Sequence, residues 1–409
     1  MLARLRTTVL LNFALALTAF LCPASTRAQT QTLALVGATL YASPTAPPLR
    51  DSVVLSTNGR ITAVGKRGEV SIPKDARVID CAGKYLVAGF WNSHIHLSEP
   101  VFTNAGSAPA APIAAHLSEM LTKWGFTTVW DLGSNPPDSL ALRSRIESGE
   151  IPGPKLLLAG DIFPKNGHPV YLPAEMKLPE AASPAEAKQM SIDDLKMGMD
   201  GMKLFTGAFM GNNPVIHMDT PIVTAAVDVA HAQHKPVFAH PQDRVGIDNA
   251  IDGGVDVLAH TITANITYTP DELARFKSQH TALIPTLSLW TTVVNDPNIA
   301  GRILDAATAQ LKAFSVNGGT VLYGTDIGFI KIFDPTLELE QMHRALSEKE
   351  ILATLTTNPA TYFKFAQKGE IKPGFDADLV VLDGDPLADV HNLTHVAYTI
   401  RAGQVIYQK

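Results

Sequence analysis

The sequence has little cysteine and no cluster of basic residues. Only two cysteines occur among 409 residues, and we expect Cys22 to be removed with an export signal. The mature chain would then keep only Cys81, so no intramolecular disulfide can form and stability must come from the core. The formal net charge is −6, and no basic block offsets it. These features exclude nucleic acid as a partner.

Long apolar runs are also lacking, apart from one at the amino terminus. Arg4 and Arg6 precede an apolar run over residues 9–22, and small residues follow it, a pattern typical of a signal peptide over residues 1–28. The run is shorter than the roughly 20 residues that cross a bilayer. We therefore expect cleavage near Ala28, no stable membrane anchor afterwards, and a periplasmic or secreted protein.

From residue 85 onward, short apolar runs rich in β-branched residues alternate with helical patterns. The runs begin at Tyr85, Phe126, Pro154, Asp200, Lys235, Val255, Thr281 and Thr320. Such alternation is typical of βα units around a parallel sheet, and eight units favour an α/β fold of the TIM-barrel, or (β/α)8, type. An open doubly wound sheet is the alternative.

The two ends of the chain have a different pattern. Residues 31–84 and the carboxyl-terminal segment contain short strands separated by Gly, Pro and Asn turns, which indicates antiparallel strands. We expect both ends to complete one small sheet domain, with parts at 29–86 and 366–409 around a barrel at 87–365.

The stretch "WNSHIHL" places His94 and His96 two residues apart. In a strand, such residues share a face, so both can point into the barrel mouth. This spacing alone leaves a metal site and an exposed polar strand end equally open. His240, His260 and Asp326 close three further predicted strands, where barrel enzymes keep their catalytic groups. Together these five side chains predict a site for zinc or a similar divalent ion.

Lys203 adds a sixth candidate in the apolar strand "GMKLF". A buried ammonium is costly and has no lone pair for a metal. Desolvation lowers the pKa of lysine, and the neutral amine can add carbon dioxide to give a carbamate. We interpret Lys203 as such a carboxylated bridge between two metal ions; the alternative is a lysine that extends toward solvent.

The motifs "HIH", "MKLF", "AHP", "LAHT" and "GTD", in this order, resemble the amidohydrolase superfamily with a binuclear metal centre. The flanks "NGRITAVG" and "GEIKPGFDADLVVLDGDPL" resemble its imidazolonepropionase-like branch, which includes prolidase-like enzymes. The resemblance implies a barrel flanked by a discontinuous β-sandwich. It also implies the following metal ligands: His94, His96 and Asp326 on one divalent ion, His240 and His260 on the other, and carboxylated Lys203 between them.

Two positions depart from the pattern of this family. Asn92 stands where many relatives have aspartate, and Thr261 stands where glycine is common. Both departures leave the candidate ligands intact. The identity of the substrate does not follow from the resemblance, because the fold does not determine specificity.

The resemblance implies hydrolysis of an amide or peptide bond in a small molecule such as a dipeptide or N-acyl amino acid. A hydroxide that bridges the metals would attack, and Asp326 would shuttle the proton. His168 and Tyr171, after the third strand, are candidates for substrate binding. Esters, lactones and cyclic amides are alternative substrates. A deaminase and a non-catalytic scaffold are less favoured, because such proteins usually lack Lys203 or other ligands. The sequence is compatible with a homo-oligomer and does not determine the oligomeric state.

Overall fold

A parallel sheet forms the centre of the computed structural model, which describes residues 32–263 and 267–409. The predicted signal peptide lies outside these residues. Eight strands of this sheet follow one another in the order β6-β7-β8-β10-β13-β14-β15-β16, and β9 pairs with β8. Their bounds are β6 Phe90–Ile95, β7 Phe126–Asp131, β8 Lys155–Pro164, β9 Glu180–Ala181, β10 Gly201–Phe205, β13 Val237–His240, β14 Val257–Leu258, β15 Ala282–Leu283 and β16 Thr320–Val321. Each predicted apolar run supplies one of the eight.

The sequential strand order differs from that of a doubly wound sheet, whose order reverses at a switch point. Backbone hydrogen bonds also join the first strand to the segment that follows the last one. The Ser93 amide donates to the Tyr323 carbonyl, and the His96 amide donates to the Ile327 carbonyl, both at 2.7 Å. The sheet is therefore curled, and its first and last segments meet beside His94.

Eleven α-helices lie in the described part of the chain, and several have start signals in the sequence. Their bounds are α1 Ala110–Met120, α2 Pro136–Glu147, α3 Pro184–Met197, α4 Thr220–His231, α5 Arg244–Asp252, α6 Pro270–Ser278, α7 Leu287–Val293, α8 Pro297–Val316, α9 Thr336–His343, α10 Glu348–Leu355 and α11 Thr357–Tyr362. Ser347 and Glu350 form a capping box at α10, as Thr269 and Glu272 do at α6, which satisfies amides that a helix start leaves unpaired. No described helix has the length and apolar character needed to cross a bilayer.

Alternation along the strands separates two apolar layers. On β8, Leu156 and Leu158 pack into the large core with helix residues. Leu157 and Ala159 point the other way, into a cluster with Trp91, Trp130 and Phe238. This period of two is what an extended strand imposes. By the same alternation, Asp161 shares the inner face with Ala159.

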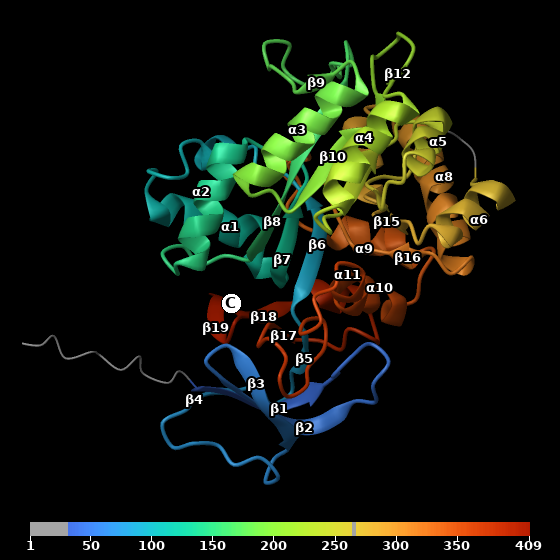
Figure 1. Ribbon diagram of the computed structural model, residues 1–409. Coiled ribbons are helices and arrows are strands. Elements are labelled where there is room, and N and C mark those ends of the chain that lie inside the picture. The colour runs from blue at the N-terminus through green and yellow to red at the C-terminus, as the bar shows by residue number, and fades with distance from the viewer. Residues whose placement is uncertain (1–31, 264–266) are drawn as a thin grey trace, which may run out of the picture. The chain divides into compact units, whose positions relative to one another are not determined.

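Strands from both ends of the chain share a second sheet, as predicted. Its strands are β1 Thr32–Leu40, β2 Leu49–Thr57, β3 Arg60–Lys66, β4 Arg77–Asp80, β5 Tyr85–Ala88, β17 Leu379–Leu382, β18 Val396–Arg401 and β19 Gln404–Gln408. The blue and red strands meet where β17 pairs with β5 (Figure 1). A short third sheet contains β11 Gly207–Ala208 and β12 Ile216–His217. The predicted sandwich and the domain boundaries stay predictions.

The run predicted as one strand from Tyr85 forms two strands in different sheets. Gly89 separates β5 from β6. A Cβ at Gly89 would come within 2.3 Å of the Thr127 Oγ1 atom, so only glycine allows the chain to pass this close to β7. Through this residue the terminal sheet leads directly into the strand that carries His94.

Candidate active site

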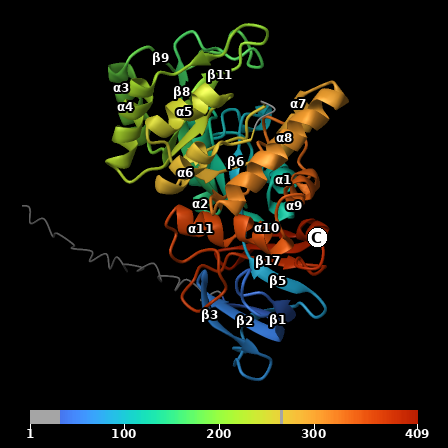
Figure 2. The same ribbon diagram turned by 90° about the vertical axis from the view of Figure 1, so that its right-hand side faces the viewer.

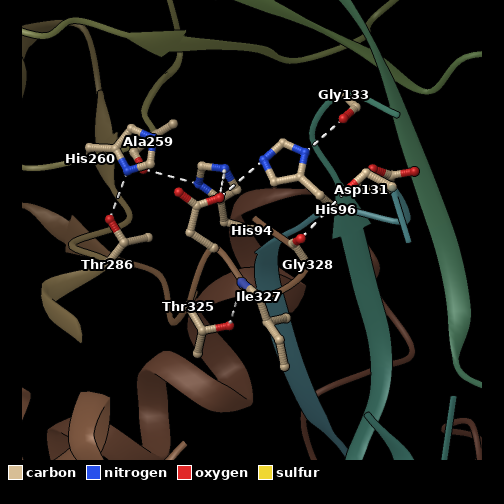
Figure 3. A network of polar contacts seen from close by, with 12 residues as sticks. His94, His96, Asp131, Gly133, Ala259, His260, Thr286, Thr325, Ile327 and Gly328 are labelled. Carbon is tan, nitrogen blue, oxygen red and sulfur yellow. Dashed lines mark hydrogen bonds and ion pairs between the residues drawn. The ribbon is translucent and has the colours of Figure 1, made fainter. Parts of the chain in front are cut away.

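Four histidines meet at one end of the central sheet. The ring centroid of His94 lies 5.3 Å from that of His96 and 4.7 Å from that of His260, and His240 lies 4.7 Å from His260. His94 lies in β6 and His96 directly follows it, while His240 ends β13 and His260 lies just after β14. Figure 3 shows His94 between His96 and His260. The structure thus brings together all four histidines that the sequence predicted as ligands.

Hydrogen-bond partners determine which nitrogen of three of these rings is free. Nδ1 of His94 lies 3.1 Å from the Ala259 carbonyl, and Nδ1 of His96 lies 2.7 Å from the Gly133 carbonyl (Figure 3). A carbonyl only accepts, so each Nδ1 carries the hydrogen. Nε2 of each neutral ring is then free to bind a metal, which is the usual arrangement of histidine ligands.

His260 obtains the same tautomer from a hydroxyl group. Its Nδ1 lies 2.7 Å from the Thr286 Oγ1 atom, and that hydroxyl donates to the Pro285 carbonyl at 2.9 Å. Because its one hydrogen is used, the hydroxyl accepts from His260 and leaves Nε2 free. His240 differs, since its Nε2 lies 3.3 Å from Gln242 Oε1. Because the amide oxygen of Gln242 only accepts, Nε2 of His240 carries the hydrogen, and its Nδ1 is the nitrogen that is free to bind a metal.

Asp326 lies against His94 and His96. Its Oδ1 atom is 3.0 Å from His96 Nε2 and 3.3 Å from His94 Nε2. One ligand atom from each of these three residues lies within 4.8 Å of the others. His94 Nε2 and Asp326 Oδ1 are buried without a hydrogen-bond partner. Such unpaired atoms are costly unless something else binds them, so the three residues fit a divalent metal ion.

Burial keeps most of these rings neutral. It lowers the pKa of His94, His240 and His260, that of His240 to about 3, and the charges of Lys203 and neighbouring imidazoles add to the effect. Burial also acts on His96, but the carboxylates of Asp326 and Asp131 outweigh it and raise the pKa. Neutral imidazoles have the lone pair that a metal requires, so the lowered pKa values of His94, His240 and His260 favour the forms that can bind a metal.

Lys203 lies on β10, with 1% of its surface exposed. Its register partners are Asp161 on β8 and Phe238 on β13. Burial lowers the pKa of Lys203 to about 8, against the opposing charges of Asp326 and Asp161. A larger share of the amine is therefore neutral near pH 8 than for an ordinary lysine. Carboxylation of Lys203 stays a prediction.

A pocket of about 890 Å³ opens over this group and is lined by all six predicted ligands. Tyr171 also lines the pocket and packs edge-on against Phe329, at 5.2 Å between ring centroids. His168 lies in the loop after β8, where its ring nitrogens face the carbonyls of Pro169 and Met176. It is not among the residues that line the pocket. Substrate contacts of Tyr171 and His168 stay predictions.

Supporting residues around the ligands were missed by the sequence analysis. The Asn92 carboxamide accepts from the amides of His94 and Thr325 and donates to the Thr325 hydroxyl. It therefore joins β6 to the segment that carries Asp326. Asp326 has a φ of +61°, a strained conformation that often occurs at functional sites. Asn92 thus positions two candidate ligands, His94 and Asp326.

A buried carboxylate anchors the segment around Thr286. Glu338 accepts the amides of Leu287 and Ser288 at 2.9 and 2.7 Å, which secures the first turn of α7. Burial raises the pKa of Glu338 to about 7. Thr286 directly precedes this turn and has a φ of +44°. Its hydroxyl is therefore held toward His260.

We expect Thr286→Val to weaken metal binding by roughly 10- to 100-fold, because residues that orient metal ligands contribute about that much. Valine has nearly the same shape but cannot accept from His260. Competition with a chelator measures the affinity. Thr224→Val, on the outer helix α4, is the matched control. An unchanged affinity in Thr286→Val would show that this hydroxyl does not orient His260.

Comparison with known proteins agrees with this geometry. The model of the amidohydrolase family matches residues 85–406. Amidohydrolase tasK of Hapsidospora irregularis is 24% identical over 381 residues, which cover 82% of this chain and only 38% of that protein. A dihydroorotase of Syntrophus aciditrophicus is 23% identical, with 81% of this chain and 84% of that protein covered.

Solved structures show a similar fold. A protein from Bifidobacterium longum described as a candidate prolidase superposes with a TM-score of 0.79 at 25% identity, covering 92% of this chain and 95% of that one. A Xaa-Pro dipeptidase solved with bound methionine gives 0.77 at 20% identity, covering 93% of this chain and 100% of the other. The family match spans most of the sequence and includes all six candidate ligands. The chain therefore belongs to the amidohydrolase family and is a hydrolase that acts on carbon–nitrogen bonds.

Proposed function

We propose that this chain is an exported, metal-dependent amidase that hydrolyses dipeptides or N-acyl amino acids. The observation that carries the proposal is the cluster of unpaired ligand atoms around Asp326. The pocket above it is large enough for a small amide substrate. Export is proposed from the amino-terminal pattern alone. The curled sheet is proposed as a closed (β/α)8 barrel, with the terminal strands as a β-sandwich.

The side chains in this site have ligand atoms suited to two divalent metal ions, and we propose that these ions are zinc. His94, His96 and Asp326 would hold one ion, and His240 and His260 the other. Lys203, once carboxylated, would supply an anionic oxygen to each. Ions bound there supply Lewis acidity and make a water molecule more acidic. Neutral imidazoles and carboxylate oxygens are ligands that zinc accepts.

Asp326 is proposed to move the proton. Its buried carboxylate takes a proton from the attacking water and delivers it to the leaving nitrogen, so the C–N bond breaks to give a carboxylic acid and an amine. The amide of Asp326 donates to the His94 carbonyl at 2.9 Å, which keeps the side chain over the site.

A hydrolysis screen tests this proposal. Metal-loaded protein should cleave members of a panel of dipeptides and N-acyl amino acids, and a chelator should remove the activity until zinc is restored. Lactones, simple esters and hydantoins serve as comparison substrates. Cleavage of esters or lactones alone would replace the amidase assignment. No hydrolysis of any compound by protein that holds metal would contradict the proposed function.

A further inference from the structure

The lining of the active-site pocket includes large apolar side chains that the proposed chemistry does not use. They come from the loop after β8, the residue after β11, α7 and the start of α8, which lies beside α7 (Figure 2). We refer to six of these pocket-lining side chains together as the apolar wall: Tyr171, Met176, Phe209, Trp290, Val293 and Ile303.

Four members of the apolar wall are unusually exposed. Tyr171, Met176, Phe209 and Val293 have between 38% and 45% of their surface in solvent. Exposed apolar surface has an unfavourable hydration free energy, and its concentration in one place is typical of binding sites. A ligand that covers these side chains would remove this surface from water.

Trp290 extends the wall to the reaction centre. It is only 6% exposed, and its ring centroid lies 6.3 Å from that of His260. The indole Nε1 donates to the Thr261 hydroxyl at 2.9 Å, and that hydroxyl donates to the Pro285 carbonyl at 3.2 Å. In this chain, therefore, a side chain beside a candidate metal ligand holds the indole in place.

Positive charge is scarce around this pocket. Among the lining residues that the structure describes, lysine occurs at Lys177 and Lys203 and arginine does not occur. Lys203 is buried among the candidate ligands, so Lys177 at the exposed edge is the one basic side chain available to a substrate carboxylate. The apolar wall itself carries no charge. A charged side chain of the substrate that packed against these apolar side chains would be desolvated at a cost in free energy.

We propose that the preferred substrates carry a bulky uncharged group, aromatic in the best case, which packs against the apolar wall beside the scissile amide. This inference rests on the proposed function for the bond that is cleaved. It deepens that function by naming the substrate class as aromatic or similarly hydrophobic N-acyl amino acids and dipeptides.

A matched series of amides tests the preference. N-acetylglycine is the baseline, N-acetylphenylalanine and N-phenylacetylglycine place a ring on either side of the amide, and N-acetyl-lysine and N-acetylaspartate add a charge. At least one aromatic compound should exceed the baseline in kcat/KM by roughly 10- to 100-fold, the effect of burying one such side chain. Equal or faster cleavage of the baseline or of a charged compound would overturn the inference.

Binding to metal-free protein separates this inference from the proposed function. The probe is N-(1-naphthyl)acetamide. Its binding to full-length protein, from which a chelator has removed the metal, is measured by calorimetry. We expect saturable binding that Trp290→Ala and Phe209→Ala each weaken by roughly tenfold or more. Phe209 is partly exposed, so its variant should fold even where the Trp290 variant does not. Val316→Ala truncates an 80% exposed apolar side chain outside the pocket and is the control.

The outcomes are distinct. Probe binding without hydrolysis of any amide would contradict the proposed function and support the apolar site. Hydrolysis without aromatic preference, or probe binding unchanged in both pocket variants, would overturn the inference and leave the amidase assignment intact.

Discussion

Asp326→Asn should lower kcat by roughly 100- to 10,000-fold, the usual contribution of a general acid and base, with a smaller effect on KM. Asparagine has nearly the same shape but cannot take up the proton. It is also one of the few residues besides glycine that tolerate a positive φ, and Asp326 has a φ of +61°. The fold and much of the metal should therefore remain. Steady-state kinetics and elemental analysis of the same preparation provide the two readouts.

Asp228→Asn is the control for this substitution, because Asp228 is an exposed carboxylate on α4. It should leave kcat unchanged. If Asp326→Asn lost its metal together with its activity, Asp326 would be mainly a ligand. If it kept both its metal and the wild-type kcat, the assignment of the proton shuttle would be wrong.

Replacement of Lys203 should nearly abolish turnover by removing metal rather than by unfolding the chain. Lys203→Ala deletes the proposed carbamate, and a short carboxylic acid or bicarbonate should restore part of the activity by taking its place. Lys203→Met fills the same space without a charge. Because a buried lysine is costly and bound metal stabilises the folded state, the comparison is made without metal. The metal-free methionine variant should unfold at a temperature at least as high as the metal-free wild type. Metal content, rescue by acetate and thermal unfolding give the readouts.

A lysine that merely extends toward solvent predicts a different pattern. Metal content and turnover would then survive in Lys203→Met, and acetate would change nothing in Lys203→Ala. Either result would remove the bridge from the proposed site. A large loss of thermal stability in metal-free Lys203→Met, relative to the metal-free wild type, would instead indicate a structural role.

The central sheet was predictable because its signal is local. Each of the eight apolar runs became a strand of the sheet, since a buried parallel strand must be apolar along its length. The four candidate histidine ligands could be grouped for a related reason, because each lies at or just after the end of β6, β13 or β14. The break at Gly89 was not predictable, since it depends on the approach of Thr127, which is distant in sequence from that run.

The residues that orient the ligands could not be found from the sequence. Gly133 contacts His96 across 37 positions, and Thr286 contacts His260 across 26. Neither residue belongs to a spacing pattern, and a carbonyl group is present in every residue. The apolar wall was missed for the same reason, because its members come from four separate segments that only the fold brings together.

Titration of metal-free protein with zinc, while hydrolysis of an N-acyl amino acid is followed, tests the central claim most directly. A binuclear amidase predicts no turnover without metal and a rise that ends at about two equivalents per chain, because both ions act on one reaction. Full turnover at one equivalent would contradict the binuclear site, and turnover in the absence of metal would contradict the metal-dependent mechanism as a whole.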